Sequence, residues 1–535
     1  MNKLFYGDNL SIMKGMGKYS VDLVYLDPPF KSQQNYNLLY KTLTGKPVPE
    51  QAEAFCDTWE MDAEKEHLAR TMPMLMREYG VEDYYVEFWR LWIQALRHTQ
   101  PHLLAYLIYM VERLLHMKII LKPTGSIFLH CDPAASHYIK VMMDGIFGAR
   151  NFRNEIIWKR TGSKGLQTRR LPSNHDVILY YALGDNSTWN ADECFIPYDH
   201  DDLPAKTLSK YSHIDSTGRR YQLSDLTNPN QNRPNLTYEF MGVTKVWRWT
   251  KQRMLEAQKN GMIVQPGPGK VPRFKRYLDE QRGIPLDDVW TDIHPLNSQA
   301  ANRMGYPTQK PPALLKRIIL AASNKGDVVF DPFCGCGTTI YAAQQTERQW
   351  IGCDIAILAV RLVEEQLQEK YRLVEDVHYT VNGIPNSMES AQALFLHDPF
   401  QFEHWAVERV GGFPTKKTGD RGIDGRIYFD MGKKELGQML LSVKGGKIRP
   451  TDIRDLKGVV SDEAGADMGG FICLEEPSKQ MRASAAQAGV WTYKGTNYPK
   501  IQILTVRDIV EGKHGFDMPS KVGTKGATRQ ISMGL

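Results

Sequence analysis

The sequence predicts an α/β protein with a doubly wound parallel sheet. Two regions, residues 1–160 and 300–375, alternate short apolar strands with helical stretches, which is the pattern of βαβ units. Residues 21–26 are rich in β-branched and aromatic side chains, as in a strand that helices bury on both faces. Further strands are expected near residues 3–10, 125–132, 327–333 and 349–355.

Length and hydropathy set the broad class of the protein. One hydrophobic core cannot account for 535 residues, so we expect about three or four domains. The longest apolar stretch, residues 103–115, is interrupted by Glu112 and Arg113 and is too short to span a bilayer. The amino terminus lacks the apolar segment of a signal peptide. We therefore expect a cytoplasmic protein with no membrane partner.

Cysteine spacing argues against structural zinc and disulfide bonds. The seven cysteines include no CxxC pair, and Cys334 and Cys336 have the wrong spacing for half of a zinc site. The net charge of +6 is compatible with a polyanionic partner but does not require one.

The strand at residues 21–26 ends in Asp27-Pro28-Pro29-Phe30. Neither proline can donate a hydrogen bond to a sheet, so the strand has to stop there. Open α/β sheets bind their ligands beyond the carboxyl ends of their strands. Asp27 and Phe30 are therefore candidate site residues, although a carboxylate in a prolyl turn is also common where nothing binds.

A second strand leads into a glycine-rich turn at residues 327–339. Gly335 and Gly337 allow a ligand to approach the backbone, and the helix that follows offers free N–H groups. Asp354 ends the next strand, where an acid can bind ribose hydroxyls. The pattern indicates a nucleoside-bearing cofactor. NAD is disfavoured because Ile340 stands where its fingerprint has glycine or alanine, and a plain strand-to-helix connection is the alternative.

Together these motifs resemble the amino-methylating DNA methyltransferases of the permuted β arrangement. Residues 27–30 look like the catalytic motif of that family, and residues 330–339 with Asp354 look like its S-adenosylmethionine-binding motifs. The segment YPTQKP at residues 306–311 stands before the cofactor motif, as in the family. The resemblance covers residues 1–375. It implies a Rossmann-like, circularly permuted methyltransferase sheet with an inserted target recognition region.

The resemblance assigns roles to the motif residues. Asp27 and the carbonyl of Pro28 would accept the amino hydrogens of a base, Pro29 would fix the turn, and Phe30 would stack on a base flipped out of double-stranded DNA. The expected S-adenosylmethionine-binding residues are Asp8, Thr308, Lys310, Asp331, Phe333, Gly335, Gly337, Thr338 and Asp354. Asp8 is equally well explained by a local turn, and Thr308 and Lys310 by capping of the next helix.

The target base is favoured to be adenine, because the family leads its motif with Asp for adenine and with Ser for cytosine. Both bases present the same kind of amino group, at N6 of adenine and N4 of cytosine, so cytosine stays open. RNA is a further alternative substrate. A DNA-binding adaptor without catalysis is the alternative from another class, and the intact Asp27, Pro28 and Phe30 argue against it.

Residues 161–299 occupy the position of the target recognition region. Asn228 and the amides that follow it, up to Asn235, could read base edges, whereas Trp247 and Trp249 alternate with an arginine and are expected to pack inward. Basic clusters that could contact phosphates are Lys159-Arg160, Arg169-Arg170, Arg219-Arg220 and residues 273–276. A solvated surface is the alternative for each cluster.

Residues 398–512 resemble the Mrr-type branch of restriction-endonuclease-like domains. Glu403, Asp424 and Lys444 match the places of a nuclease centre that would hold Mg²⁺ through Asp424. Ser442 departs from the pattern because it stands where a second metal-binding or orienting side chain belongs. A DNA-binding domain that does not cut and the nuclease half of a restriction-modification enzyme are the two alternatives.

These predictions divide the chain into six segments. They are a catalytic half at residues 1–160, a target recognition region at 161–299, a cofactor-binding half at 300–375, a linker at 376–397, a restriction-endonuclease-like domain at 398–512 and a flexible tail at 513–535. The insertion at residues 41–117 suggests no role beyond core packing or dimer contact. A second copy of the chain or a restriction-modification partner is expected besides DNA.

Overall fold

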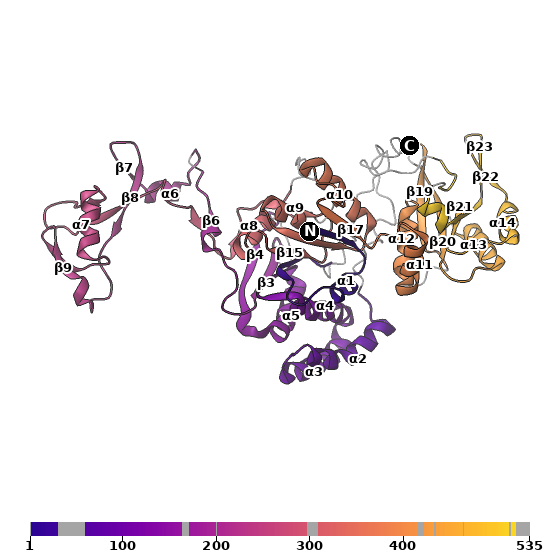
Figure 1. Cartoon of the computed structure of the whole chain (residues 1–535), viewed down its shortest axis with the longest axis horizontal. Coiled ribbons are helices and arrows are strands. Elements are labelled where there is room, and N and C mark those ends of the chain that lie inside the picture. Colours follow the sequence, from indigo (N-terminus) through magenta and orange to yellow (C-terminus); the bar gives the residue numbers. More distant parts are fainter. Residues whose placement is uncertain are drawn as a thin grey trace. The chain divides into compact units, whose positions relative to one another are not determined.

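The computed structural model describes residues 2–29, 59–162, 171–199, 201–296, 309–415, 422–432, 435–463, 465–512 and 515–519 (Figure 1). The chain divides into two compact units, Met1–Asn190 with Asp288–Leu535, and Ala191–Asp287. Phe30 and Thr308 of the expected site lie outside the described residues. Within the described part, no helix is long and apolar enough to cross a membrane.

The larger unit contains a nine-stranded sheet of order β14-β4-β5-β3-β2-β15-β16-β1-β17. Its strands are β1 (Asn2–Tyr6), β2 (Val21–Leu26), β3 (Leu121–Cys131), β4 (Phe152–Trp158), β5 (Asp176–Ala182), β14 (Val289–Trp290), β15 (Val328–Asp331), β16 (Gln349–Asp354) and β17 (Tyr379–Asn382). Neighbours from β3 to β17 are parallel, as predicted. Strand β5, which falls within the region predicted for target recognition, lies instead between β3 and β4 and is antiparallel to both. An antiparallel neighbour needs no helical crossover.

Both faces of this sheet are covered, which explains the continuous apolar run of β2. Leu23 and Tyr25 belong to one hydrophobic cluster, and Val24 and Leu26 belong to the other. The first cluster includes α8 (Pro312–Ala322), α9 (Thr338–Gln345) and α10 (Ile357–Tyr371). The second includes α1 (Asn9–Lys14), α4 (Pro101–Ile120) and α5 (Pro133–Met143). Alternate side chains of the strand thus enter two cores, and the predicted doubly wound α/β class is confirmed.

Asp22 is the polar exception in β2, and its carboxylate is fully engaged. It accepts hydrogen bonds from Lys122 Nζ at 2.8 Å and from the backbone N–H of Val328 at 2.9 Å. Because Val328 begins β15, the second bond joins the strand of the prolyl motif to the strand of the glycine-rich turn. A buried carboxylate is tolerated when it is paired in this way.

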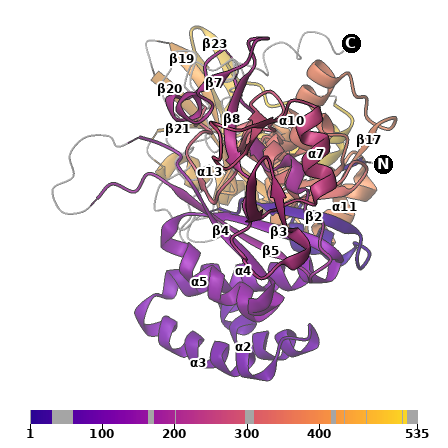
Figure 2. The ribbon, with the colours of Figure 1, turned by 90° about the vertical axis from the view of Figure 1, so that its left-hand side faces the viewer.

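The helical insertion packs onto the α4 side of the sheet. Helices α2 (Ala63–Glu78), α3 (Asp83–Thr99) and α4 contact one another, and Figure 2 shows them grouped below β4 and β5. Trp89 is buried, whereas Tyr84 and Phe88 on the same helix are exposed. Core packing therefore accounts for part of the aromatic content of α3.

The smaller unit has its own core. Trp247 is fully buried, and Trp249 packs edge to face on Phe274 with ring centres 4.8 Å apart, in line with the inward orientation predicted for both tryptophans. The unit is narrower than residues 161–299 because β5 is buried within the main sheet. Its elements are β6 (Phe195–Ile196), α6 (Ala205–Lys210), β7 (His213–Ile214), β8 (Arg220–Asp225), β9 (Thr237–Phe240), β10 (Val243–Val246), α7 (Lys251–Lys259), β11 (Ile263–Val264), β12 (Arg273–Tyr277) and β13 (Ile284–Pro285).

The carboxyl-terminal part forms a second α/β fold around a five-stranded sheet of order β18-β19-β20-β21-β24. Its strands are β18 (Phe413–Pro414), β19 (Gly425–Gly432), β20 (Glu435–Lys444), β21 (Ala466–Cys473) and β24 (Ile501–Thr505), with the hairpin β22 (Val490–Tyr493) and β23 (Thr496–Pro499). Its helices are α11 (Met388–His397), α12 (Pro399–Arg409), α13 (Pro450–Asp462), α14 (Lys479–Ala486) and α15 (Val506–Val510). Helix α11 lies within the segment predicted as a linker.

Helix α12 also contacts the fold that is built on the nine-stranded sheet. The carboxylate of Glu408 accepts a hydrogen bond from the backbone N–H of Ile357, the first residue of α10, at 3.0 Å. Trp405 is fully buried in the hydrophobic cluster that also contains Val360 and Val363 of α10. The two folds of the larger unit therefore share one continuous core.

Candidate active site

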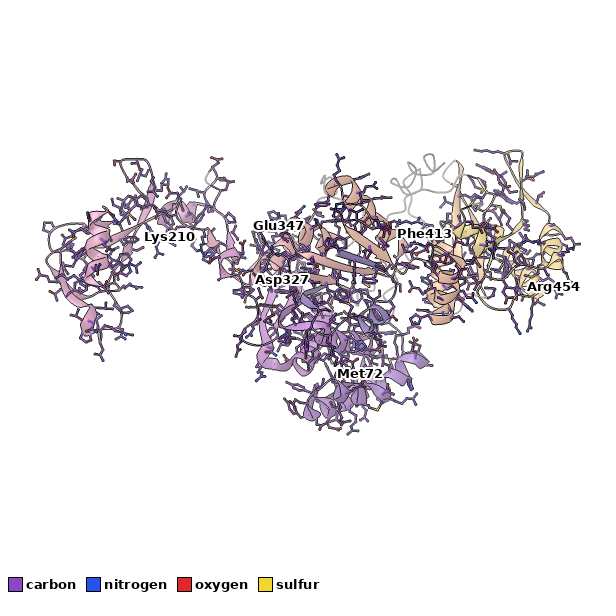
Figure 3. The ribbon with its side chains drawn as sticks, in the orientation of Figure 1. Met72, Lys210, Asp327, Glu347, Phe413 and Arg454 are labelled. Atoms are coloured by element: carbon purple, nitrogen blue, oxygen red, sulfur yellow. The ribbon has the colours of Figure 1, made fainter. Side chains whose placement is uncertain are left out.

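The carboxyl ends of three parallel strands meet at one edge of the nine-stranded sheet. In the register, Phe330 of β15 pairs with Val24 of β2, and Asp331 pairs with Gly352 of β16. Figure 3 labels Asp327 and Glu347, which precede β15 and β16 and therefore mark the opposite edge. The residues that follow β2, β15 and β16 are thus brought together, as the sequence predicts for a ligand site.

Asp27 forms an ion pair with Lys310 directly after β2. Their side chains are only 17% and 12% exposed, respectively, so the pair is largely shielded from water. Lys310 precedes Pro311, which caps the amino end of α8. The sequence predicts Lys310 as a cofactor-binding residue, and the structure places its ammonium on the catalytic candidate Asp27. Pro28 is buried beside Asp27, and Pro29 is partly buried.

Asp331 organises the glycine-rich turn between β15 and α9. Its carboxylate accepts hydrogen bonds from the backbone N–H of Phe333 at 3.0 Å and from the hydroxyl of Thr339 at 2.5 Å. Burial raises the pKa of Asp331 to about 7, and the charges of Asp27 and Asp354 act in the same direction. Asp331 therefore holds the turn from inside, and its buried carboxyl has little capacity left for a cofactor.

The turn requires glycine at residue 337. Gly337 has a φ of 81°, and a Cβ there would lie 2.7 Å from a methyl group of Val363. Gly335 also has a positive φ, of 49°. Thr338, the first residue of α9, is buried. The backbone can follow this path only without a side chain at residue 337, whereas the φ of Gly335 only favours glycine.

Asp354 ends β16 and ties two turns together. One carboxylate oxygen accepts from the backbone N–H of Gly335 at 2.8 Å, and the other accepts from Ala356 at 2.9 Å. Asp354 is partly exposed. Loss of water around its carboxyl raises the pKa to about 6, although the hydrogen bonds that the carboxylate accepts act to lower it. Each carboxylate oxygen has a second lone pair, so Asp354 can still accept hydrogen bonds from two ligand hydroxyls.

Asp8 takes the local role that the sequence offers as one of two alternatives, and its contact with the cofactor stays a prediction. It caps α1 by accepting from the backbone N–H of Ser11 at 3.2 Å, and its other carboxylate oxygen pairs with Arg113 at 2.5 Å. Arg113 also donates to the side chain of Asn9 at 2.7 Å. Sequence reasoning missed Arg113, although a charge inside the apolar stretch at residues 103–115 was the available signal.

A second missed group lies beneath the prolyl motif. Tyr25 bonds to Nδ1 of His130 at 2.9 Å, and Nε2 of the same ring lies 3.1 Å from the carboxylate of Asp176. Arg160 contacts the other oxygen of Asp176 at 3.1 Å. Burial would raise the pKa of Asp176, but its hydrogen bond with His130 and the charges of Lys310 and Arg160 outweigh that effect and lower it. These residues come from four separate elements, and no sequence spacing connects them.

The nuclease-like residues lie on α12, directly before β19 and at the end of β20. Asp424 accepts from the backbone N–H of Val443 at 2.6 Å, and the hydroxyl of Ser442 lies 3.4 Å away. Lys444 ends the same strand, β20, and Glu403 lies on α12. Among the described residues, no group of three or more His, Cys, Asp or Glu side chains could hold a metal ion.

In the smaller unit, one predicted phosphate contact is already occupied. Arg219 forms ion pairs with Asp279 and Glu280, both at 2.7 Å, and stacks over Tyr277. Asn228 and Asn230 each accept a backbone hydrogen bond from the residue two positions on. The side-chain oxygens of Asn228 and Asn230 therefore stabilise the loop. Their side-chain N–H groups are the atoms that could donate hydrogen bonds to a base.

Comparison with known proteins identifies the family. Residues 21–365 match the model of the N6/N4 methyltransferase family, which is described as DNA methylase. The chain belongs to this DNA methylase family. Residues 400–511 match the family described as NACHT-associated inactive restriction endonuclease 1. The resemblances of both regions are thereby confirmed.

Individual relatives agree with the DNA methylase assignment. M.EcaI of Enterobacter cloacae, a type II methyltransferase, is 33% identical over 264 residues, which are 48% of this chain and 56% of the relative. YhdJ of Escherichia coli K12, a DNA adenine methyltransferase, is 60% identical over 50 residues, which are 9% of this chain and 17% of the relative. The chain spans about half the length of curated relatives such as M.EcaI, M.HpaI and the StyLTI Mod subunit.

Solved structures show lower similarity. TTHA0409 of Thermus thermophilus, complexed with S-adenosyl-L-methionine, is 15% identical and covers 71% of this chain and 100% of its own, with a TM-score of 0.32. The cytosine-N4-specific PvuII DNA methyltransferase is 12% identical and covers 70% of this chain and 88% of its own, with a TM-score of 0.30. The family model covers both N6 and N4 methylases, so the target base of this DNA methylase stays a prediction.

The raised pKa of Asp331 predicts how the stability of the unliganded protein depends on pH. Between pH 4 and 7 the folded state holds a proton on Asp331 that the unfolded state has released, so this contribution, up to about 4 kcal/mol, is lost as the pH rises through 7. Asp331→Asn cannot titrate, and its melting temperature should fall less than that of the wild type between pH 5 and 8. Equal pH dependence in thermal unfolding of the two proteins would contradict the assignment.

Proposed function

We propose that the protein transfers a methyl group from S-adenosylmethionine to the exocyclic amino group of a base in DNA. The observation that carries this proposal is the position of Asp27, which lies at the same sheet edge as the glycine-rich turn and Asp354. Membership of the DNA methylase family supports the reaction class. The circular permutation of the sheet remains part of the same proposal.

The charges at this edge suit a cationic cofactor. Asp27, Asp331 and Asp354 lie close enough for their charges to raise the pKa of Asp331. A sulfonium is positively charged, and it would lower the cost of keeping these carboxylates ionised together. Gly335, Gly337 and Asp354 would hold the nucleoside, with Asp8 at its adenine. When bound, S-adenosylmethionine supplies an electrophilic methyl group.

The residues after β2 activate the amino group. Its lone pair is delocalised into the base, and acceptors on both hydrogens draw the nitrogen toward tetrahedral geometry. Asp27 accepts one hydrogen and the carbonyl of Pro28 accepts the other, while Lys310 holds one oxygen of Asp27 and orients the second. After transfer the nitrogen carries a positive charge and releases a proton, for which Asp27 is the nearest base in this arrangement.

Adenine N6 is the proposed target, because Asp leads the prolyl motif, and Phe30 is the proposed stacking partner of the flipped base. Incubation of DNA with deuterium-labelled S-adenosylmethionine, followed by mass spectrometry of the nucleosides, would identify the modified base. Label in N4-methyl-2′-deoxycytidine would show that the target base is cytosine and not adenine. Preferential labelling of RNA, when RNA and DNA compete, would show that the substrate is RNA.

For the carboxyl-terminal domain we propose DNA binding without cleavage. Its family match is described as inactive, and Ser442 stands beside Asp424 where a charged or amide side chain is needed. Lys444 is partly exposed, and Lys447 and Arg449 in the next loop are exposed, so this strand end presents cations to solvent. Phosphate contacts by such cations are independent of DNA sequence.

Substitution of Asp27 tests the catalytic role. Asp27→Asn should lower methyl transfer at least about a hundredfold, because the amide accepts hydrogen bonds more weakly and cannot take up a proton. Binding of S-adenosylmethionine in calorimetry should weaken by a much smaller factor than methyl transfer, because only one of the carboxylates near the sulfonium loses its charge. The matched control is Asp327→Asn, at the opposite edge of the sheet, which should methylate normally. Full activity of the Asp27 variant would exclude this mechanism.

A cleavage assay tests the carboxyl-terminal domain. With Mg²⁺ and unmethylated plasmid, the wild-type protein should leave the DNA intact. Lys444→Ala should weaken DNA binding at low salt, whereas Lys479→Ala on α14, another exposed lysine, should not. Cleavage by the wild type that disappears in the Lys444 variant would instead show an active nuclease.

A further inference from the structure

Helix α4 carries a buried arginine that donates to two side chains at the start of α1 and to the backbone oxygen of Tyr109 on its own helix. The side chain of Arg113 is 8% exposed. It donates to Asp8 at 2.5 Å and to Asn9 at 2.7 Å, and its guanidinium lies 3.5 Å from the centre of the Tyr109 ring. Planar stacking and a fork of donors are properties of arginine that lysine lacks.

The partners of Arg113 are themselves fixed to the glycine-rich turn. The side-chain amide of Asn9 donates to the backbone oxygen of Pro332 at 2.9 Å, and the Tyr109 ring lies 6.4 Å from the ring of Phe333. Pro332 and Phe333 begin the turn between β15 and α9. One side chain of α4 therefore connects the start of α1 to the predicted S-adenosylmethionine-binding turn.

Helix packing alone does not explain an arginine at this position. The neighbours of Arg113 on α4 include the fully buried Leu114 and Val111, and an apolar side chain would fill the same space. Burying a guanidinium costs free energy that its partners have to offset, and exchange of buried ion pairs for apolar residues is often neutral or stabilising. The charge therefore points to a role in the site.

The orientation of Asp8 supplies that role. Arg113 engages one carboxylate oxygen and Ser11 the other, so the carboxyl plane is fixed from two sides. The Asp8 side chain remains 27% exposed, and each oxygen keeps a second lone pair. A carboxylate held on both oxygens presents its remaining lone pairs in fixed directions, so it can accept a hydrogen bond from an amino group placed to meet one of them.

We propose that Arg113 is a positioning residue that aims Asp8 at the 6-amino group of the cofactor's purine, so that α4 contributes to the choice of methyl donor. This inference rests on the proposed function, in which Asp8 lies at the adenine of S-adenosylmethionine. It assigns a role to the charge that interrupts the apolar stretch at residues 103–115.

The test compares two cofactor products that differ at the purine amino group. S-adenosylhomocysteine carries the amino group, whereas S-inosylhomocysteine carries a carbonyl oxygen that would face the Asp8 carboxylate. Calorimetry on the full-length wild type should show a preference of about tenfold or more for the adenosine form, the usual effect of a hydrogen bond to a charged group. Arg113→Met should weaken binding of the adenosine form and bring the ratio of the two affinities close to one.

Two controls separate positioning from folding and from the proposed function. Asp354→Asn should weaken both compounds alike and keep their ratio, because the ribose is common to them. Arg113→Lys keeps the charge without the planar fork, so it should fold and show an intermediate ratio. A folded Arg113→Met, or Arg113→Lys if the former does not fold, that keeps the wild-type ratio would overturn the proposal for Arg113. A wild type that binds neither compound would instead overturn the proposed function.

Discussion

The pairing of β15 with both β2 and β16 is the constraint on which the site depends. All three strands are parallel, so the residues that follow them emerge at one edge, although the prolyl motif and the glycine-rich turn are far apart in the sequence. The Asp22 carboxylate reinforces this pairing by accepting from Val328. A shift of one residue in the register of β15 would turn its side chains to the opposite face, and Asp331 could no longer hold the turn.

Electrostatics at this edge follow from the same arrangement. Several carboxyl groups gather where water is scarce, and each has a specific partner: Lys310 for Asp27, Thr339 for Asp331, and Arg113 for Asp8. The partners differ in function. Thr339 and the backbone stabilise the turn from inside, whereas Lys310 and Arg113 leave part of each carboxylate available to a ligand. A cationic methyl donor would favour the ionised forms of Asp331 and Asp354, whose pKa values burial raises.

Local patterns in the sequence predicted the parts of the site that depend on residues adjacent in the chain. The prolyl stop after β2 and the glycines of the turn are such features. A strand that is buried on both faces has a continuous apolar sequence, and positive φ angles favour glycine, so both features are visible in the sequence itself. Arg113, His130 and the contact of Lys310 with Asp27 could not be predicted, since each depends on which distant strands become neighbours. The same reason applies to the antiparallel β5, whose sequence reads like that of any buried strand. For the nuclease-like motif, the sequence was enough to recognise the residues but not to predict their chemistry. Ser442 departs from the motif, so the sequence allows both a domain that cleaves DNA and one that does not.

The most direct measurement is a structure of the full chain with sinefungin, an amine analogue of the methyl donor, and a DNA duplex that contains the modified site. We expect the ribose on Asp354, the adenine beside Asp8, and a flipped base whose amino group bonds to Asp27 with the amine of sinefungin facing it. An analogue bound away from the edge formed by β2, β15 and β16, or a target base that makes no contact with Asp27, would contradict it.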